Sequence, residues 1–319
     1  MKKHPFIFSV VLGLILPWLM FSAAETFYHR EQSEQEIQFQ STHPAESVML
    51  NVQMPDGEIE TLEIEAYLVG VLLGEMPANF EIEALKAQAV AARTFALKSM
   101  KSNYKHKTFD LCTDSSCCQN YYRTNSYLAD GGTQDSVDKV CSAVAESAGR
   151  VLLYNGELIE ATFFSCSGGK TEDALAVWGT DVPYLQAIDS PGEENATHYM
   201  DTIVLSVHEF QRKLSRELSG LPGNWIENVS YTAGGGVDTI KIDGQTYTGM
   251  EIRKLLGLNS TAFIISQVGD SFTITTKGFG HRVGMSQYGA DAMAVAGKSY
   301  EEILAYYYPG TYLSDYRDI

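Results

Sequence analysis

The sequence predicts an α+β fold, in which helices and short strands form one elongated domain with a substrate groove. Three features support this class. Residues 47–52 and 59–64 alternate apolar and polar side chains around a turn, which predicts an antiparallel hairpin. Two helical patterns follow, at residues 65–74 and 80–100. A second hairpin is predicted at residues 150–164, because its middle is an Asn-Gly pair, a favoured two-residue turn.

Composition and charge restrict the class of protein. Of the 319 residues, 45% are apolar and 11% aromatic, which is enough to bury a full hydrophobic core. Acidic residues outnumber basic ones by 40 to 23, so the formal net charge is -17. Binding to nucleic acid depends on basic side chains that neutralise phosphates. The charge therefore argues against a nucleic-acid partner.

The first residues predict a membrane anchor. Residues 6–24 are almost free of charge and are long enough to cross a bilayer core. Lys2 and Lys3 precede them, so residues 1–24 are predicted to be a cytoplasmic tip and a single transmembrane segment. The rest of the chain is then predicted to lie outside the cytoplasm. Small residues near position 24 leave a cleaved signal peptide as the alternative.

Beyond the anchor, the sequence predicts a tether and one folded domain. Residues 25–46 are polar and show no apolar period, as in a tether. The folded domain is predicted to cover residues 47–319. A helix at residues 208–218 and several short strands predict an appended α+β portion at about 195–275 within this domain.

Glu75 lies at the joint between the first two predicted helices. Pro77 ends the first helix near Met76, and Asn79 is a candidate N-cap for the second. At a helix C-terminus, among apolar neighbours, a carboxyl is expected to keep its proton to a higher pH than usual. Such a group is suited to act as a general acid. A solvated glutamate at a helix end is the alternative interpretation.

Lys86 and Arg93 project from one side of the second predicted helix, because they are seven positions apart. They are candidate substrate-binding cations for hydroxyl, acetamido or carboxylate groups. In so acidic a chain, ion pairs with Glu81, Glu83 or other acids are the alternative.

The five cysteines are an odd number and do not fit a simple framework of paired disulfides. His106, Cys112 and Cys118 are equally spaced in a polar loop and form a candidate three-ligand zinc site, with Cys117 as the alternative to Cys118. A disulfide is the competing interpretation. The metal is predicted to hold this loop over the second helix. A free fourth coordination position would leave room for a catalytic water.

Two glycine-containing segments are candidate ligand contacts. Ser165 ends the second hairpin in Ser-Cys-Ser-Gly-Gly, and the segment 278–289 contains His281 and Gln287. Glycines let the backbone approach a ligand closely, so these three side chains are candidate substrate-binding groups. Simple turns and a hydrogen-bonded structural histidine are the alternatives.

Three motifs resemble the SpoIID/LytB family. They begin at Tyr67 (YLVGVLLGEMPA), Glu83 (EALKAQAVAARTFAL) and Gly280 (GHRVGMSQYGA). The resemblance runs in order through nearly all of residues 47–312. It implies that residues 47–319 are a SpoIID-like catalytic domain, a peptidoglycan lytic transglycosylase that acts during engulfment in sporulation.

The resemblance also implies the reaction and the residues that perform it. Glu75, in the Glu-Met-Pro motif, is the implied acid and base, and Lys86 and Arg93 match the family's cations on the following helix. The enzyme would cleave MurNAc-GlcNAc bonds of peptide-stripped glycan strands and leave 1,6-anhydroMurNAc ends. Glu75 would first protonate the leaving oxygen and then accept the proton of the MurNAc C6 hydroxyl. The sequence contains no obligatory second acid, in contrast to two-carboxylate hydrolases.

Cofactor and partners are implied in the same way. Similar proteins carry a zinc ion bound by one His and two Cys, which matches His106, Cys112 and Cys118 and implies structural Zn²⁺. The implied partners are peptidoglycan glycan strands, a SpoIIP-like wall amidase and a SpoIIM-like membrane scaffold protein, in the intermembrane space around the forespore. A non-catalytic glycan-binding activator or scaffold of the amidase is the alternative function.

Two segments depart from the family's pattern. Phe164 stands where a histidine is common, and Cys166 stands where a small polar residue is common. Arg282 replaces the middle glycine of Gly-His-Gly-Val-Gly-Met. These changes are expected to tune the groove without altering Glu75.

Overall fold

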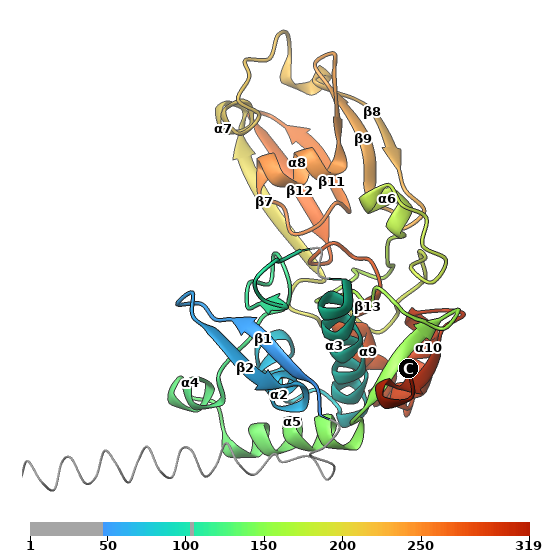
Figure 1. Cartoon of the computed structure of the whole chain (residues 1–319). Coiled ribbons are helices and arrows are strands. Elements are labelled where there is room, and N and C mark those ends of the chain that lie inside the picture. The colour runs from blue at the N-terminus through green and yellow to red at the C-terminus, as the bar shows by residue number, and fades with distance from the viewer. Residues whose placement is uncertain (1–46, 103–104) are drawn as a thin grey trace, which may run out of the picture. The chain divides into compact units, whose positions relative to one another are not determined.

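The structure is a computed structural model of the chain, and it describes residues 47–102 and 105–319. The predicted anchor at 1–24 and the predicted tether at 25–46 lie outside the described residues. Within the described ranges, no helix combines the length and the apolar character needed to cross a membrane. Val48–Ile319 form one compact unit. Its mixture of helices and short sheets confirms the α+β class (Figure 1).

The opening hairpin is present as predicted. β1 (Met49–Gln53) and β2 (Ile59–Glu63) pair in antiparallel fashion, with Leu50 opposite Leu62. A third strand, β3 (Leu111–Cys112), runs parallel to β1. The sheet thus fixes the polar, cysteine-rich loop against the first strand of the domain.

The two predicted helices follow, as α2 (Ile64–Glu75) and α3 (Ile82–Ser102). Because α2 is apolar on every side, it is buried along most of its length. It ends at Glu75 because Pro77 disfavours the helical conformation in the residue before it. The prediction of Asn79 as N-cap is wrong: Phe80 N–H donates to the Pro77 carbonyl in a turn, and α3 begins only at Ile82.

The second hairpin is only partly as predicted. β4 (Arg150–Tyr154) and β5 (Glu157–Leu158) meet at the Asn-Gly turn, where both residues have positive φ. The predicted outgoing strand is interrupted, because Thr162 N–H donates to the Glu160 carbonyl in a turn. The chain then continues as β6 (Phe163–Phe164), which pairs in parallel with β13 (Met285–Ser286). The distant β14 (Tyr312–Asp315) completes the sheet of β4 and β5.

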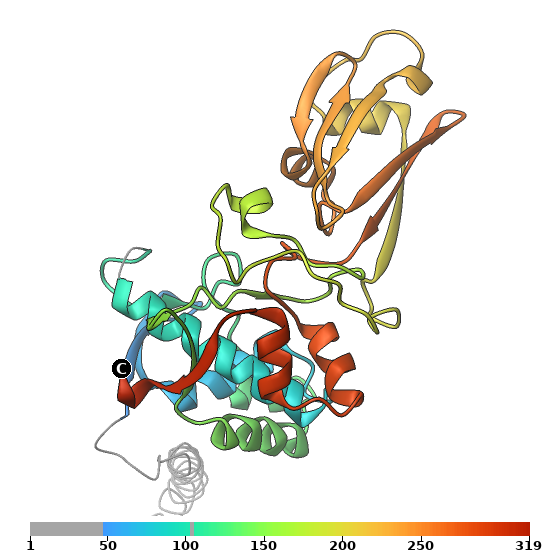
Figure 2. The same cartoon turned by 90° about the vertical axis from the view of Figure 1, so that its right-hand side faces the viewer.

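Residues 200–277 form two three-stranded antiparallel sheets with a hydrophobic cluster of their own. Phe210, Trp225 and Phe272 stack in this cluster. Figures 1 and 2 both show these elements side by side. They are β7 (Met200–Ser206), α7 (Val207–Lys213), a 3-10 helix (Pro222–Asn224), β8 (Ile226–Tyr231), β9 (Val237–Ile242), β10 (Gln245–Thr248), α8 (Gly249–Leu256), β11 (Phe263–Val268) and β12 (Ser271–Lys277).

The remaining helices surround α2 and α3. α5 (Gln134–Glu146) packs against both, and α9 (Gln287–Val295) and α10 (Tyr300–Tyr307) pack against α3 (Figure 2). α9 begins at Gln287 because the Ser286 side chain accepts the N–H of Gly289 and caps the helix. Short elements complete the fold: α4 (Thr124–Ala129), α6 (Ala174–Trp178) and a 3-10 helix (Tyr316–Asp318).

Candidate active site and metal centre

Glu75 is the last residue of α2, and the loop that follows the cysteines lies against it. The Asn120 backbone N–H donates to Glu75 Oε1 at 2.5 Å, and Asn120 Nδ2 donates to the Gly74 carbonyl at 2.6 Å. A Cβ atom on Gly74 would come within 3.0 Å of the Tyr121 backbone nitrogen. Gly74 therefore lets the loop rest directly on the helix end, where Asn120 satisfies an otherwise unpaired carbonyl.

The environment of Glu75 favours its protonated form. Burial raises the pKa of the carboxyl, because the charged form loses hydration. The hydrogen bond from Asn120 and the nearby Gln287 amide favour the carboxylate and oppose part of this shift. The net effect is a raised pKa, as the sequence predicted. At neutral pH a larger share of Glu75 is therefore protonated than for a solvated glutamate.

Glu75 lies in the wall of a groove of about 690 Å³. Ser165, His281 and Gln287, three of the predicted substrate-binding residues, line the same groove. Among the described residues, Glu75 is the only carboxylate that lines it, and neither lysine nor arginine does. Its aromatic lining comes from Phe95, Tyr127, Phe163, Phe164, Phe279 and Tyr288. The groove is thus suited to a largely uncharged, hydroxyl-bearing ligand.

Gln287 lies at the first position of α9 and is 4% exposed. Its Nε2 makes no hydrogen bond of normal geometry in the described part of the chain, although the amide is close enough to Glu75 to favour the carboxylate. A buried amide without a partner is costly, and this one lines the groove beside Glu75. Gln287 is therefore placed to donate a hydrogen bond to a ligand or to the Glu75 carboxylate.

His281 is held between two aromatic rings. Its ring centroid lies 5.7 Å from that of Phe164 and 5.4 Å from that of Trp178. Its Nδ1 accepts a hydrogen bond from the Val283 N–H at 3.1 Å. Burial, and next the charge of Arg253, lower the pKa of His281 to about 4. The imidazole is therefore neutral at neutral pH. It is hydrogen-bonded within the fold and also lines the groove, and its contact with a ligand stays a prediction.

Lys86 and Arg93 do not lie in the groove. Arg93 is fully buried, and its Nε and Nη2 donate to the two oxygens of Glu65 at 2.9 and 2.5 Å. Lys86 Nζ lies 2.8 Å from Glu83 and 2.5 Å from Glu146. The arrangement therefore fits the ion-pair alternative, because both cations already pair with acids of the fold, and the substrate contact stays a prediction.

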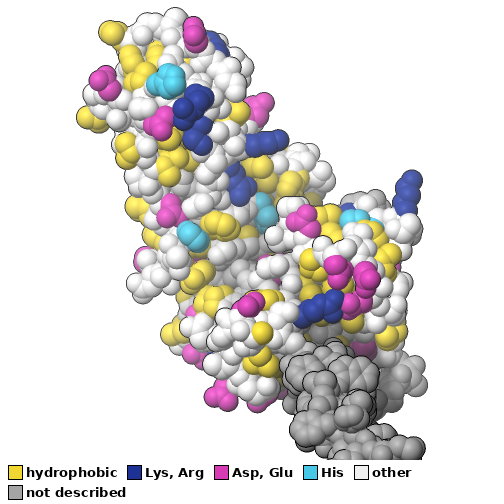
Figure 3. Space-filling view, turned by 90° about the vertical axis from the view of Figure 1, so that its left-hand side faces the viewer, with side chains coloured by type: hydrophobic (Ala, Val, Ile, Leu, Met, Phe, Trp, Pro, Cys, Tyr) yellow, Lys and Arg dark blue, Asp and Glu magenta, His cyan; other side chains and the backbone are white. Residues whose placement is uncertain are grey.

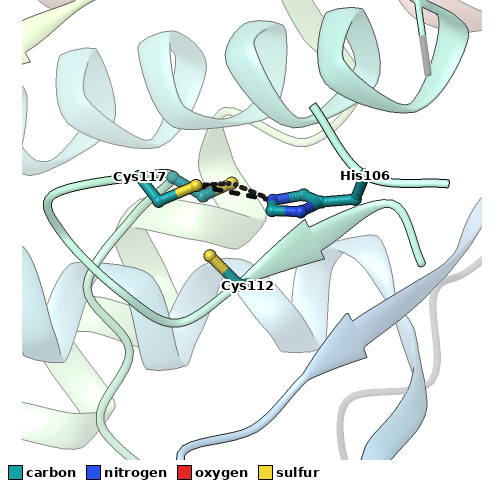
Figure 4. A group of neighbouring side chains, drawn as sticks. His106, Cys112 and Cys117 are labelled. Carbon is teal, nitrogen blue, oxygen red and sulfur yellow. Dashed lines mark hydrogen bonds between the residues drawn. The ribbon is translucent and has the colours of Figure 1, made fainter. Parts of the chain in front are cut away.

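A histidine and three cysteines converge in the loop between α3 and α4 (Figure 4). One candidate ligand atom from each of His106, Cys112, Cys117 and Cys118 lies within 4.8 Å of all the others. The His106 Nε2 atom is 3.3 Å from Cys118 Sγ and 3.5 Å from Cys117 Sγ. The structure thus brings together the three predicted ligands and also Cys117, which the sequence offered as an alternative to Cys118.

The cluster has the size of a tetrahedral metal site. Zinc bonds of about 2.0–2.3 Å to nitrogen and sulfur place neighbouring ligand atoms about 3.5–3.8 Å apart. The His106 distances and the 3.9 Å between the sulfur atoms of Cys117 and Cys118 approach this spacing. None of these cysteines forms a disulfide in the structure. Three sulfurs and one imidazole nitrogen fit a closed, four-coordinate zinc site.

The metal cluster and Glu75 are joined by two residues of chain. Cys118 belongs to the cluster and also lines the groove. Gln119 is fully buried and accepts a hydrogen bond from the Tyr67 hydroxyl at 3.1 Å, and Asn120 then donates to Glu75. A metal bound by the cluster would therefore fix the loop that places a hydrogen-bond donor against Glu75.

Arg282, which departs from the pattern of the SpoIID/LytB family, forms a buried cross-link. It adopts a φ of 65°, in the left-handed region that favours glycine, and is 2% exposed. Its guanidinium donates to the carbonyls of Ser167 at 2.8 Å, Lys170 at 2.7 Å and Gly234 at 2.8 Å. It also pairs with Glu172 at 3.3 Å. The larger side chain thus points away from the groove and ties the Ser-Gly-Gly segment to the turn before β9.

Cys166 and Phe164, the other departures, have separate surroundings. Cys166 is fully buried, and its Sγ donates to Glu193 Oε2 at 3.1 Å. Ser167 N–H donates to the same oxygen at 2.6 Å. Phe164 lines the groove and packs against His281. Phe164 therefore makes an apolar surface where the family commonly has a histidine.

Sequence analysis missed several residues of the groove, above all Asn120, Tyr127, His198 and Phe279. Asn120 follows the cysteines by two positions, so its nearness to a predicted metal ligand was the available signal. Phe279 lies between the glycines of the C-terminal motif. No local pattern distinguishes Tyr127 or His198, because only the tertiary fold brings their segments to Glu75.

Comparison with known proteins agrees with the motifs. A family model described as "Stage II sporulation protein" (SpoIID) matches residues 56–154. Stage II sporulation protein D of Bacillus subtilis (strain 168) is 38% identical over 99% of this chain and 96% of that protein. The protein of the same name from Bacillus amyloliquefaciens is 41% identical over 81% of this chain and 76% of that protein. An amidase enhancer of Bacillus subtilis (strain 168) is 32% identical over 78% of this chain and 40% of that protein. The chain therefore belongs to the stage II sporulation protein D family, and its role is in sporulation.

Proposed function

We propose that this protein is a lytic transglycosylase that cleaves MurNAc-GlcNAc bonds in peptide-stripped peptidoglycan, with Glu75 as its acid and base. One observation carries the proposal: a carboxyl with a raised pKa is the only carboxylate lining the groove within the described part of the chain. Hydrolases of glycosidic bonds generally need two carboxyl groups, one on each side of the bond. A single carboxyl suits intramolecular attack, in which the sugar supplies its own nucleophile.

The reaction needs two proton transfers at one residue. Protonated Glu75 gives its proton to the glycosidic oxygen as the bond from that oxygen to MurNAc C1 breaks. The resulting carboxylate accepts the proton of the MurNAc C6 hydroxyl while O6 bonds to C1, so Glu75 regains its proton and no water is consumed. Asn120 N–H stabilises the carboxylate between these steps, and burial favours return of the proton.

The metal proposed for the cluster is Zn²⁺ in a structural role. His106, Cys112, Cys117 and Cys118 would hold it, and zinc would supply the bonds that fix a loop lacking a hydrophobic core. A site with three protein ligands would leave a fourth position for a catalytic water. Four protein ligands fill that position. The groove-facing residues alone perform the proposed chemistry.

The proposal extends to location and partners. A chain anchored by residues 1–24, with residues 47–319 outside the cytoplasm, would meet glycan strands in the intermembrane space around the forespore. A SpoIIP-like amidase would remove the stem peptides beforehand, and a SpoIIM-like membrane protein would hold the two enzymes together. The absence of lysine and arginine from the groove lining, among the described residues, suits strands without anionic peptides.

A second function is favoured by one comparison. The amidase enhancer that is 32% identical to this chain is named for activation of an amidase. The corresponding role here would be a glycan-binding activator or scaffold of a partner amidase, with no bond cleavage by Glu75.

Mass spectrometry of the products tests both functions. The purified protein is incubated with peptide-free glycan strands beside Glu75→Gln and, as matched control, Glu157→Gln, whose side chain is exposed on β5. Wild type and Glu157→Gln should release fragments with anhydro ends, and Glu75→Gln should be slower by about 10²–10⁴-fold. Fragments with reducing ends would indicate a hydrolase. Binding without products would favour the activator.

A further inference from the structure

His198, which the sequence did not single out, lies on the groove wall with its ring already fixed. Its Nδ1 is 2.9 Å from Asp201 Oδ2, and its ring stacks on Phe279 with centroids 4.8 Å apart. Asn259 Nδ2 donates to the same oxygen of Asp201. Asp201 Oδ2 thus accepts a hydrogen bond from Asn259 and also fixes the orientation of the His198 ring.

This arrangement defines the chemistry of the free ring nitrogen. A carboxylate only accepts hydrogen bonds, so the shared proton lies on His198 Nδ1. In the neutral ring, Nε2 is then an acceptor. No group in the described part of the chain is hydrogen-bonded to Nε2, and the His198 side chain is 41% exposed. The groove therefore contains a pre-oriented hydrogen-bond acceptor in addition to Glu75.

Phe279 gives this acceptor an apolar neighbour. The ring is 40% exposed and also lines the groove. A pyranose presents C–H bonds on its face and hydroxyl groups at its edge, so it can pack on an aromatic ring and donate a hydrogen bond beside it. An exposed phenyl ring stacked with a fixed imidazole matches this pattern.

The His198 segment is joined to the part of the groove that contains Glu75. Thr197 Oγ1 lies 3.3 Å from the Tyr288 hydroxyl, and Tyr288 follows Gln287 on α9. The Tyr199 carbonyl accepts the Gly278 N–H at 3.1 Å, next to Phe279. One continuous wall therefore runs from Glu75 through α9 to His198.

We propose that His198 and Phe279 form a sugar-binding subsite of the groove, in which His198 Nε2 accepts a ring hydroxyl and Phe279 packs on the sugar face. Asp201 is the positioning residue that sets the orientation and tautomer of His198. The subsite rests on the proposed function, because it takes one pyranose unit of the strand that Glu75 cleaves.

Calorimetric titration of the full chain with peptide-free glycan strands tests the subsite, on a Glu75→Gln background that prevents turnover. His198→Ala and Phe279→Leu should each bind about 3- to 10-fold more weakly, which corresponds to the loss of one hydrogen bond or one apolar contact. His208→Ala is the matched control, because His208 is exposed on α7 and outside the groove lining. Thermal melts confirm that each variant is folded.

A double-mutant comparison tests Asp201. Asp201→Asn should weaken binding when His198 is present and change it by less than about 2-fold in the His198→Ala background. Equal losses in both backgrounds would show that Asp201 acts on the fold and not through His198. Affinities of His198→Ala and Phe279→Leu equal to that of His208→Ala would overturn the subsite.

The same measurements separate the subsite from the proposed function. If the Glu75→Gln parent does not bind the strands at all, the subsite and the proposed substrate both fail. If the parent binds and the His198 effect appears, but wild type forms no anhydro ends, the subsite stands and the transglycosylase fails.

Discussion

At the scale of single residues, burial of Glu75 raises the pKa of its carboxyl and is expected to lower the stability of the fold at high pH. Its carboxyl is desolvated, which raises its pKa, and only part of this effect is offset by Asn120 and Gln287. The native state therefore holds this proton more tightly than the unfolded chain does. Stability is expected to fall as the pH rises from the ordinary pKa through the raised one, because the native carboxylate is the disfavoured species.

Glu75→Gln should consequently stabilise the protein at neutral and alkaline pH. Glutamine keeps an oxygen that can accept the Asn120 N–H but carries no charge to desolvate. The variant should melt at a higher temperature than wild type at about pH 8. The difference should become small near pH 4, where Glu75 is mostly protonated in both the native and the unfolded state. Calorimetric melting at both pH values measures this, with Glu157→Gln as control. A difference that is independent of pH would contradict the assignment.

The sequence predicted single residues wherever local pattern determines their surroundings. Glu75 was singled out because Pro77 ends its helix, and His281, Gln287 and Ser165 because glycines lie near them. All four line the groove. The partner of Arg93 could not be predicted in the same way. A cation on a helix has the same sequence pattern whether it binds a ligand or pairs with a buried acid such as Glu65. His198 and Asn120 depend on long-range contacts and left almost no signal.

At the scale of elements, the loop between α3 and α4 links the cluster of His106 and three cysteines to the Glu75 carboxyl. Cys112 is held by β3, whereas Cys117 and Cys118 follow a turn in which their N–H groups donate to the Asp114 carbonyl. The spacing in the sequence predicted a candidate site, but only the fold showed that both neighbouring cysteines belong to the cluster.

Cys112→Ser should remove the metal and slow the reaction. Loss of one thiolate weakens zinc binding, the loop relaxes, and Asn120 no longer holds Glu75, which should lower activity on the order of 10²-fold. Cys141→Ser on α5 is the matched control, since Cys141 is outside the cluster. Metal content and activity are measured on both variants. Full activity of the metal-free variant would remove the positioning role.

Arg282→Met should strongly destabilise the fold. It leaves Glu172, which is fully buried, without its cationic partner, and a broken buried pair costs about 3–5 kcal/mol. The control is Arg212→Met, because Arg212 Nη2 is 3.9 Å from Glu209 on an exposed surface and should matter by less than about 1 kcal/mol. Urea denaturation gives both values. Equal stabilities of the two variants would show that the Arg282 cross-link contributes nothing.

At the scale of the whole molecule, residues 200–277 have their own hydrophobic cluster, separate from the helices that carry Glu75. The sequence indicated an appended portion here through its run of short strands. It could not give the pairing of β7 with β12, because strand order depends on residues far apart in the chain. Figure 3 shows one face of the molecule, on which acidic, basic and hydrophobic side chains are interspersed.

Phe272→Ala tests whether the two parts unfold together. Phe272 is fully buried and stacks on Phe210 and Trp225, so the substitution should cost about 3–5 kcal/mol. The chain has three tryptophans, so the fluorescence of Trp225 is measured in a background that carries both Trp18→Phe and Trp178→Phe, and its transition should shift to lower urea. If the two parts unfold independently, the metal proposed for the loop should be released at the same urea concentration as in the protein without Phe272→Ala. A common shift of both signals would show one cooperative unit.

The groove is expected to form late in folding, because it includes the parallel pair of β6 and the distant β13. The Thr162 side chain donates to the Val283 carbonyl across a sequence separation of 121 residues, and the neighbouring strands pair Phe163 with the similarly distant Met285. Contacts of such high contact order form slowly, because a long loop must close first. Glu75 and its helix are complete early in synthesis, but His281 and Gln287 join them only after the C-terminal motif has been made. A nascent or truncated chain therefore has the Glu75 carboxyl without the groove in which the proposed reaction would take place.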